Sequence, residues 1–492
     1  MNQNSRSHQL SRVWRAIFLG LQFLLVLSLA GCYDDPPKWD AIPQTTTTPA
    51  SSPTTAVETT NELVIYLDTS ASMAGYVTKD GQSIFGKTLR ELRFATGTFA
   101  NSDAKVLVRH VASDIGPALA DMELTTASQD QNVYRGGETN LAGAIESFRG
   151  ATTPVSAAAQ TTTAKVSTSE NPKPAPIPRF HILVTDGVQS TRQGGATRDC
   201  ATGSDQFCVR QKIGELLQAK WGGCILGIRA DFHGKVYSEV NHSAIPYETH
   251  PNDPASFRPF YLYVFSPDPQ ALDSLVSSLK ERLRKLVPPA EPIRELNLSL
   301  PYTTGPAEFE TVVDKDARAF ITREHPASPT RLTLRVDVDT EKSGAKPFSI
   351  VAKLPWSDHA LDTANEAELA QLLTWKVEGV YPPQAESAAR RFPDVKITQT
   401  HVDSPGHITI DATTGFAAGT GDPSWRVYRI EARLNLNQIS PSWIKDWSVD
   451  LDTTREVGNR TFNLETALLG LWNASTAKNH VVAEGYLRIG PK

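Results

Sequence analysis

The sequence predicts an α/β fold, with a doubly wound and mainly parallel sheet, followed by a β-rich second domain for which a sandwich is one candidate. Between Leu63 and Leu286, short apolar runs alternate with segments of helical periodicity, which favours parallel strands joined by helical crossovers. Beyond about residue 291 apolar residues recur every second position, as in antiparallel strands with one face in water. The chain of 492 residues is long enough for two or three domains.

Individual elements follow from these periodicities. In the first domain we expect strands at 63–67, 105–112, 180–184, 224–228 and 260–265, and helices over 84–99, 141–148, 209–221 and 269–283. Asp268 is placed to cap the last of these helices, with Pro269 in its first turn. In the second domain we expect strands at 332–338, 373–377, 395–398, 408–410, 428–436 and 485–489, and one helix over 463–472.

The overall charge of the chain argues against a nucleic-acid partner. The hydrophobic content of 40% and the charged content of 21% are ordinary for a globular protein. The formal net charge of -5 gives no electrostatic reason to bind a polyanion. We therefore expect no nucleic-acid partner.

The N-terminus has the layout of an export signal. Arg6, Arg12 and Arg15 precede an uncharged, mostly apolar segment over 16–30 that is short for a membrane span. It ends on Leu29-Ala30-Gly31-Cys32, which resembles a bacterial lipobox, and this implies removal of a signal peptide (1–31) and a lipid on Cys32. The alternative is a plain signal peptide with a chance cysteine. The resemblance places the protein in the cell envelope, anchored to a membrane and facing the periplasm or the exterior, with the outer membrane favoured because Tyr33 follows the cysteine.

Two segments have a linker-like composition. Residues 32–60 are rich in Thr, Ser and Pro and have few large apolar side chains, so they cannot bury enough surface to offset chain entropy, and we expect a flexible tether. Residues from about 150 to 178 are similar, but the alternating pattern resumes after them, which predicts a surface insertion. The predicted domains are therefore 61–286 and 291–492, with a joint at Val287-Pro288-Pro289-Ala290.

The other cysteines predict one disulfide and one buried thiol. Cys200 and Cys208 lie close together in a polar stretch, and an exported protein meets an oxidising compartment, so a small disulfide loop is expected. Cys224 lies within an apolar run and is expected to be free and buried. The spacing of the cysteines does not suggest zinc.

Oxygen-bearing side chains gather in three segments of the first domain. Asp68, Ser70 and Ser72 follow the first strand, Thr139 lies in a glycine-rich loop before a helix, and Asp186 ends a later strand. In open α/β sheets, ligands bind beyond the carboxyl ends of the strands. Hard oxygen donors suit a small divalent cation such as Mg²⁺. The sequence therefore predicts a metal site at this edge of the sheet.

The order of these motifs resembles a known family. Asp-x-Ser-x-Ser followed by Met, then a Gly-Gly-x-Thr-Asn-Leu loop opening a helix, then an apolar strand ending in Thr-Asp-Gly, is similar to the von Willebrand factor type A domain with an intact metal-ion-dependent adhesion site. The similarity covers roughly residues 61–286. It implies that Ser70, Ser72 and Thr139 ligate the cation through hydroxyls, and that Asp68 and Asp186 hold it largely through ordered waters. The cation implied is Mg²⁺, with Mn²⁺ or Ca²⁺ as alternatives.

The resemblance implies binding of a protein partner. Two carboxylates kept behind waters leave the cation under-neutralised, so an acidic side chain of a partner can complete its octahedron. We expect a binding protein and not an enzyme, because the sequence contains no Gly-x-Ser-x-Gly or His-Glu-x-x-His motif. Two alternatives remain: a scaffold or assembly factor of an envelope complex, and a hydrolase with its chemistry in the second domain.

Several polar and aromatic residues have simpler interpretations. The five candidate ligands could also cap helices and turn loops, as Asp, Ser and Thr commonly do. His181 is expected to be an ordinary strand residue, and Asp231 and His233 to be polar groups of a loop. Four tryptophans of the second domain are expected to lie in the core rather than along a carbohydrate or peptide groove: Trp425, Trp443, Trp447 and Trp472.

Overall fold

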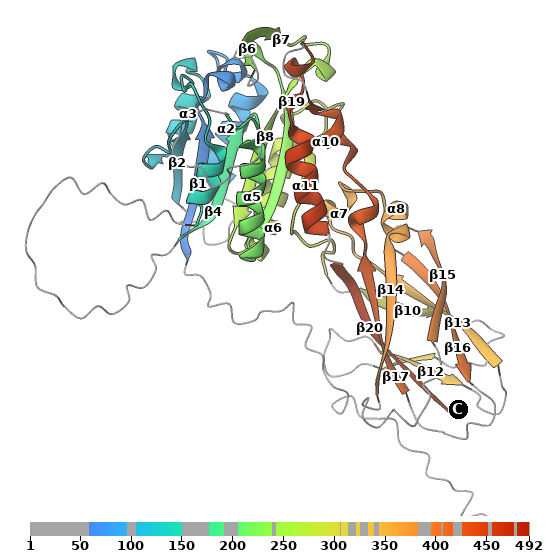
Figure 1. Cartoon of the computed structure of the whole chain (residues 1–492). Helices are drawn as coiled ribbons and strands as arrows, with labels where there is room; N and C mark the ends of the chain where they lie inside the picture. The colour runs from blue at the N-terminus through green and yellow to red at the C-terminus, as the bar shows by residue number, and fades with distance from the viewer. Residues whose placement is uncertain are drawn as a thin grey trace, which may run out of the picture.

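The described residues form two connected parts, a helix-covered sheet and a region of two further sheets (Figure 1). The computed structural model describes residues 59–95, 105–149, 177–190, 205–238, 243–305, 307–312, 321–324, 333–338, 344–381, 395–404, 407–416, 426–450, 455–476 and 480–491. The predicted signal peptide, Cys32, all but the end of the tether, and the insertion up to residue 176 lie outside these ranges.

The first part is built on a seven-stranded sheet in the order β3-β2-β1-β4-β8-β5-β9. Its strands are β1 (Thr59–Asp68), β2 (Lys105–Val111), β3 (Leu119–Ala120), β4 (Ile177–Thr185), β5 (Gly222–Ala230), β8 (Arg258–Ser266) and β9 (Arg294–Asn297). Its helices are α2 (Ile84–Arg93), α3 (Glu123–Ala127), α4 (Leu141–Ser147), α5 (Asp205–Gln218) and α6 (Pro269–Leu283), with short 3₁₀ turns η2 (Ala71–Tyr76), η4 (Gln131–Val133) and η5 (Pro254–Ser256).

Strand β1 is buried on both faces, as its continuous apolar run predicts. Leu63, Ile65 and Leu67 belong to one core cluster, to which α2 and α6 contribute. Val64 and Tyr66 belong to the other, to which α4 and α5 contribute. Because successive side chains of a strand point to opposite faces, helices on both sides are needed to cover this run. An α/β unit with helices on both faces of its sheet is confirmed.

The direction of β8 differs from the expected parallel alternation. β1 pairs in parallel with β2 and β4, whereas β8 is antiparallel to both β4 and β5. Between β5 and β8 the chain forms the hairpin β6 (His233–Tyr237) and β7 (Ala244–Glu248) and then η5, with no helical crossover. A parallel return needs such a crossover, so the chain re-enters the sheet from the edge it has just left. Arg258, the first residue of β8, therefore lies at the carboxyl ends of β4 and β5.

Helix α6 begins where the sequence predicts. The Asp268 side chain accepts a hydrogen bond from the backbone N–H of Ala271 at 3.1 Å, and Pro269 occupies the first turn. The predicted apolar face is fully buried: Leu272, Leu275, Val276, Leu279 and Leu283.

The second part is β-rich, as predicted. One sheet has the order β10-β13-β16-β15 and the other the order β11-β12-β20-β17-β14. The strands are β10 (Glu308–Val312), β11 (Ile321–Glu324), β12 (Thr333–Val338), β13 (Gly344–Lys353), β14 (Leu373–Tyr381), β15 (Val395–Ser404), β16 (His407–Phe416), β17 (Arg426–Leu434) and β20 (His480–Pro491), and two short helices, α7 (Asp358–Leu361) and α8 (Glu366–Gln371), lie between them in the chain. β12 and β20 pair in parallel, unlike the antiparallel pairs expected, because they are distant in sequence and no hairpin constrains them.

The sequence boundary near residue 290 does not separate the two parts in space. β9, beyond the predicted joint, pairs with β5 at the edge of the first sheet. Residues 436–476 also return to the first part, with α11 beside α5 (Figure 1). This return segment contains η6 (Leu436–Gln438), α10 (Ser442–Asp446), β18 (Ser448–Val449), η7 (Arg455–Gly458), β19 (Thr461–Phe462) and α11 (Leu464–Thr476).

The tryptophans of the return segment are core residues. Trp443, Trp447 and Trp472 are all buried, which confirms the expectation of a core role, and Trp425 lies outside the described residues. Trp447 packs beside the Tyr261 ring of β8, at a centroid distance of 6.3 Å. Within the described ranges, no helix combines the length and the apolarity needed to cross a bilayer.

Candidate metal site at the edge of the sheet

The first predicted ligands lie together directly after β1. Asp68 is fully buried, and its Oδ1 accepts a hydrogen bond from the backbone N–H of Ser70 at 2.9 Å. The Ser70 and Ser72 hydroxyl oxygens lie 3.0 Å apart. The chain leaves the strand at Asp68 and enters the short turn η2, which turns the side chains at alternate positions toward one another.

Backbone pairing brings the Thr139 loop to the same place. Gly136 donates its N–H to the Thr69 carbonyl at 2.9 Å, and its own carbonyl accepts from the Ala71 N–H at 2.8 Å. A Cβ at Gly136 would lie 3.0 Å from the Cβ of Ala112, so this close approach favours glycine. Thr139 Oγ1 then donates to Asp68 Oδ1 at 3.4 Å. Four of the five predicted ligands are thus linked by contacts at one point.

Asp186 reaches this point from the end of β4. The preceding residue, Thr185, donates its hydroxyl to Asp68 Oδ2 at 2.7 Å. Asp186 is buried, and its Oδ1 accepts from the backbone N–H of Val188 at 3.2 Å. Gly187 has a φ of +83°, the left-handed conformation that a tight turn requires here. The structure therefore places Asp186 beside the other predicted ligands.

The two carboxylates are close enough to affect each other. Burial and, next, the negative charge of Asp186 raise the pKa of Asp68 to about 7. One buried guanidinium, that of Arg258, faces this pair, so two ionised carboxylates keep an excess of negative charge that a divalent cation would offset.

Gln189 and Ser190 hold the loops around the site but were not predicted. Gln189 donates its side-chain N–H to the Thr139 carbonyl at 2.9 Å, and its Oε1 accepts from the Ala142 N–H at 3.0 Å. Ser190 Oγ accepts from the Thr139 N–H at 3.0 Å. These residues match no motif, and only their position three and four residues after Asp186 could have drawn attention to them. They fix the Thr139 loop against the Asp186 loop.

Arg258 is a third residue at the site that sequence reasoning missed. Its Nη2 lies 3.2 Å from Asp186 Oδ2, and both side chains are only 1% exposed. The residue reaches the site because β8 is antiparallel and begins at this edge. A local apolar pattern cannot reveal that direction.

The donor set fits a hard divalent cation. The three hydroxyls and two carboxylates offer only oxygen, which Mg²⁺ and Ca²⁺ prefer over nitrogen and sulfur. Across the described ranges, no group of three or more His, Cys, Asp or Glu side chains is arranged to hold a metal. A cation here would therefore depend on Ser70, Ser72 and Thr139 as well as on the two aspartates.

The other polar candidates have structural roles. His181 is fully buried in β4, its Nε2 lies 3.0 Å from the Pro178 carbonyl, and burial lowers its pKa to about 3. Asp231 Oδ1 accepts from the Ile84 N–H at 2.9 Å, at the start of α2. His233 pairs with Glu248 across the β6–β7 hairpin, with 3.0 Å between Nδ1 and Oε1.

The cysteine predictions are tested in part. Cys224 is free and buried, as expected. Cys208 is disulfide-bonded, and Cys200, its predicted partner, lies outside the described residues.

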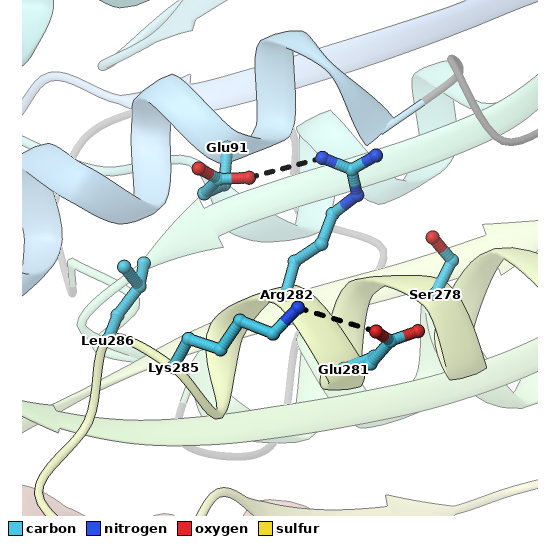
Figure 2. A pocket seen from close by; sticks show the side chains of 6 residues that line it. All are labelled: Glu91, Ser278, Glu281, Arg282, Lys285 and Leu286. Carbon is cyan, nitrogen blue, oxygen red and sulfur yellow. Dashed lines mark hydrogen bonds and ion pairs between the residues drawn. The ribbon is translucent and has the colours of Figure 1, made fainter.

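A separate pocket of about 390 Å³ lies between α2 and α6 (Figure 2). Arg282 crosses it to pair with Glu91 at 3.3 Å, and Lys285 pairs with Glu281 at 3.4 Å. These cations and anions already neutralise one another in an open setting, so the pocket is a weaker candidate than the sheet edge.

Comparison of the chain with protein-family models, curated proteins and solved structures found no match. The family resemblance therefore rests on the order of the motifs in the sequence.

Proposed function

We propose that this protein binds an acidic side chain of a partner protein through a divalent cation, held at the sheet edge in the manner of a von Willebrand factor type A domain. The observation that carries the proposal is the meeting of three separate segments. Ser70 and Ser72 lie 3.0 Å apart, and Thr139 reaches the same Asp68 carboxylate that orders the Ser70 backbone. Asp186 adds the second carboxylate.

In the proposed site, the hydroxyls of Ser70, Ser72 and Thr139 ligate Mg²⁺, and Asp68 and Asp186 hold it largely through waters. Mn²⁺ and Ca²⁺ are alternatives with the same preference for oxygen. The bound cation supplies an open coordination position for a carboxylate. Because the protein's own carboxylates are buried and oriented by Thr185, Val188 and the Ser70 backbone, they stay in place whether or not a partner is bound.

The wider organisation is also part of the proposal. The first part would be a variant of the doubly wound type A fold, with β8 inserted antiparallel, and the two sheets of the second part would pack as a sandwich. The contact between β14 and β15, which belong to different sheets, supports this packing. We further propose that a lipid on Cys32 and the tether over 32–60 hold this assembly at a membrane of the cell envelope.

Two other functions, each from a different class of protein, are alternatives to this proposal. The first is a scaffold or assembly factor of an envelope complex, in which metal is secondary. The second is a hydrolase with its chemistry in the β-rich part. We favour binding over catalysis because the sequence contains neither a Gly-x-Ser-x-Gly nor a His-Glu-x-x-His motif.

Titration of the full mature chain with Mn²⁺ and Mg²⁺, followed by calorimetry, tests the cation site. Thr139→Val removes one proposed ligand while keeping the side-chain volume, and we expect it to weaken cation binding at least about tenfold. Thr126→Val, at an exposed position of α3, is the matched control and should bind as the native chain does. A native chain that binds neither cation contradicts the proposal.

Capture from an envelope extract then tests the partner. We expect the native chain to retain a protein partner in Mg²⁺ and to release it in chelator, and we expect Thr139→Val to retain little. Capture that depends on neither chelator nor Thr139 would favour the scaffold. Turnover of an ester, peptide or glycan panel would favour the hydrolase.

A further inference from the structure

Arg258 lies between the candidate site and a segment from the far end of the chain, residues Val457–Thr461, called here the strap. Its Nη1 donates to the carbonyls of Val457 at 2.6 Å, Gly458 at 3.2 Å and Arg460 at 3.4 Å. Its Nη2 donates to Asp186 Oδ2 at 3.2 Å. One buried guanidinium therefore joins a predicted ligand to the strap.

The strap contacts Asp186 by a second route. Thr461 Oγ1 donates to the Asp186 carbonyl at 3.4 Å, and the same hydroxyl lies 2.9 Å from the Tyr261 hydroxyl. Arg258, Tyr261 and Thr461 are all buried. The side chain and the backbone of Asp186 are thus both attached to a segment more than 270 positions later in the chain.

The positive charge of Arg258 would affect the binding of a cation at the proposed site. A guanidinium taken out of water is costly unless an anion and further acceptors stabilise it, and here Asp186 and three carbonyls accept from its two Nη atoms, while its buried Nε has no partner among the described residues. A divalent cation bound at Asp68 and Asp186 would share the Asp186 carboxylate with Arg258 and would be repelled by its positive charge. The more firmly the strap holds Arg258 against Asp186, the weaker the cation binds.

We propose, on the basis of the cation site proposed above, that Arg258 is an internal counter-cation for Asp186, positioned by the strap, and that it lowers the affinity of the site for a divalent cation. Coupling of this kind is reciprocal, so a bound cation also weakens the docking of the strap. Cation binding at the sheet edge is thereby linked to the return segment, and through it to the β-rich part.

Calorimetric titration of the full chain with Mn²⁺ measures how Arg258 and the strap affect the affinity of the site for the cation. Arg258→Gln keeps side-chain donors for the carbonyls but removes the charge, and we expect Mn²⁺ to bind about tenfold more tightly. Arg258→Lys keeps the charge and should bind much as the native chain does. Thr461→Val loosens the strap alone and should tighten binding by a smaller factor.

Arg229→Gln is the matched control. Arg229 also lies near this edge, but it packs on Trp447 and pairs with Glu291 at 3.5 Å. This variant should have native Mn²⁺ affinity. If native and Arg258→Gln chains bind Mn²⁺ equally, Arg258 only joins the two parts and the inference is overturned, whereas a native chain without Mn²⁺ binding contradicts the cation site itself.

Hydrogen exchange of the native chain measures the reciprocal effect, that of the bound cation on the docking of the strap. This measurement does not require any variant to fold. Mn²⁺ should speed the exchange of the backbone amides over residues 457–461, while amides of α6, which follows the end of β8 opposite to Arg258, should be unaffected. Strap amides whose exchange is unchanged by saturating Mn²⁺ would overturn the inference.

Discussion

Thr185 donates its hydroxyl to Asp68 Oδ2 at 2.7 Å, so the last residues of the neighbouring strands β4 and β1 are joined directly across the edge of the sheet. The same Thr185 oxygen accepts the backbone N–H of Gly187 at 3.0 Å, in the turn that carries Asp186. Thr185 is thus not a proposed ligand, but it orients the carboxylate of one aspartate and the loop of the other.

Thr185→Val should therefore destabilise the protein. The substitution preserves the branched shape but leaves a buried carboxylate without one of its donors, which costs about 1–3 kcal/mol. Urea-induced unfolding in the absence of divalent cations measures this loss. Thr185→Ser retains the hydroxyl and should lose much less, so equal stabilities of the valine and serine variants would argue against the hydrogen bond.

Much of the site could be predicted because its information is local. The apolar run before Asp68 shows a strand, and the spacing of Ser70 and Ser72 shows a turn of small hydroxyl residues. The cap of α6 at Asp268 depends likewise on residues within one helical turn. Short-range patterns of this kind are set by backbone geometry and can be read in one sequence.

The missed features depend on contacts between distant segments. The direction of β8 follows from the β6–β7 hairpin after β5, which keeps the chain at the same edge of the sheet, and Arg258 reaches Asp186 only as a result. The packing of α11 on α5, and of the strap on Arg258, joins residues about 200 or more positions apart. An apolar face shows that a helix is covered but not which segment covers it, so these relationships could not be predicted.

Gln189→Ala should weaken cation binding more than it weakens the fold. The Gln189 side chain links the Thr139 carbonyl to the Ala142 N–H, so its removal frees the loop that presents the Thr139 hydroxyl. We expect about a tenfold loss of Mn²⁺ affinity by calorimetry and a loss of about 1–2 kcal/mol in the free energy of unfolding. Gln218→Ala, at the exposed end of α5, is the control. Native affinity in Gln189→Ala would show that the Thr139 loop is held by its other contacts alone.

Cys224 should resist alkylation in the folded protein. Its side chain is fully buried, and burial raises the pKa of the thiol well above its ordinary value, so little thiolate is present or accessible. Mass spectrometry after iodoacetamide treatment at neutral pH should find Cys224 unmodified in the native chain and modified once urea passes the unfolding midpoint. Rapid labelling without denaturant would contradict the packing of β5 against β8 and β9.

His359 should make the stability of the protein depend on pH. This buried histidine of α7 lies between two carboxylates, with Nδ1 2.7 Å from Glu295 and Nε2 2.9 Å from Asp273, and it thereby attaches the second part to β9 and α6. Burial alone would lower the pKa of His359, but the hydrogen bonds to Asp273 and Glu295 outweigh burial and the nearby charge of Lys280, and raise the pKa to about 9.

The sign of the effect follows from this raised pKa. The imidazolium is favoured in the folded state, so its contribution is complete below the unfolded pKa of 6.5 and is lost as the pH rises through about 9. The free energy of unfolding should fall by about 3 kcal/mol between these limits. In His359→Gln that fall should be absent, whereas His233→Gln, which removes a histidine from the exposed β6–β7 hairpin, should keep it. A native chain whose urea midpoint stays level from pH 6.5 to pH 9 would show that His359 does not carry a charge between Glu295 and Asp273.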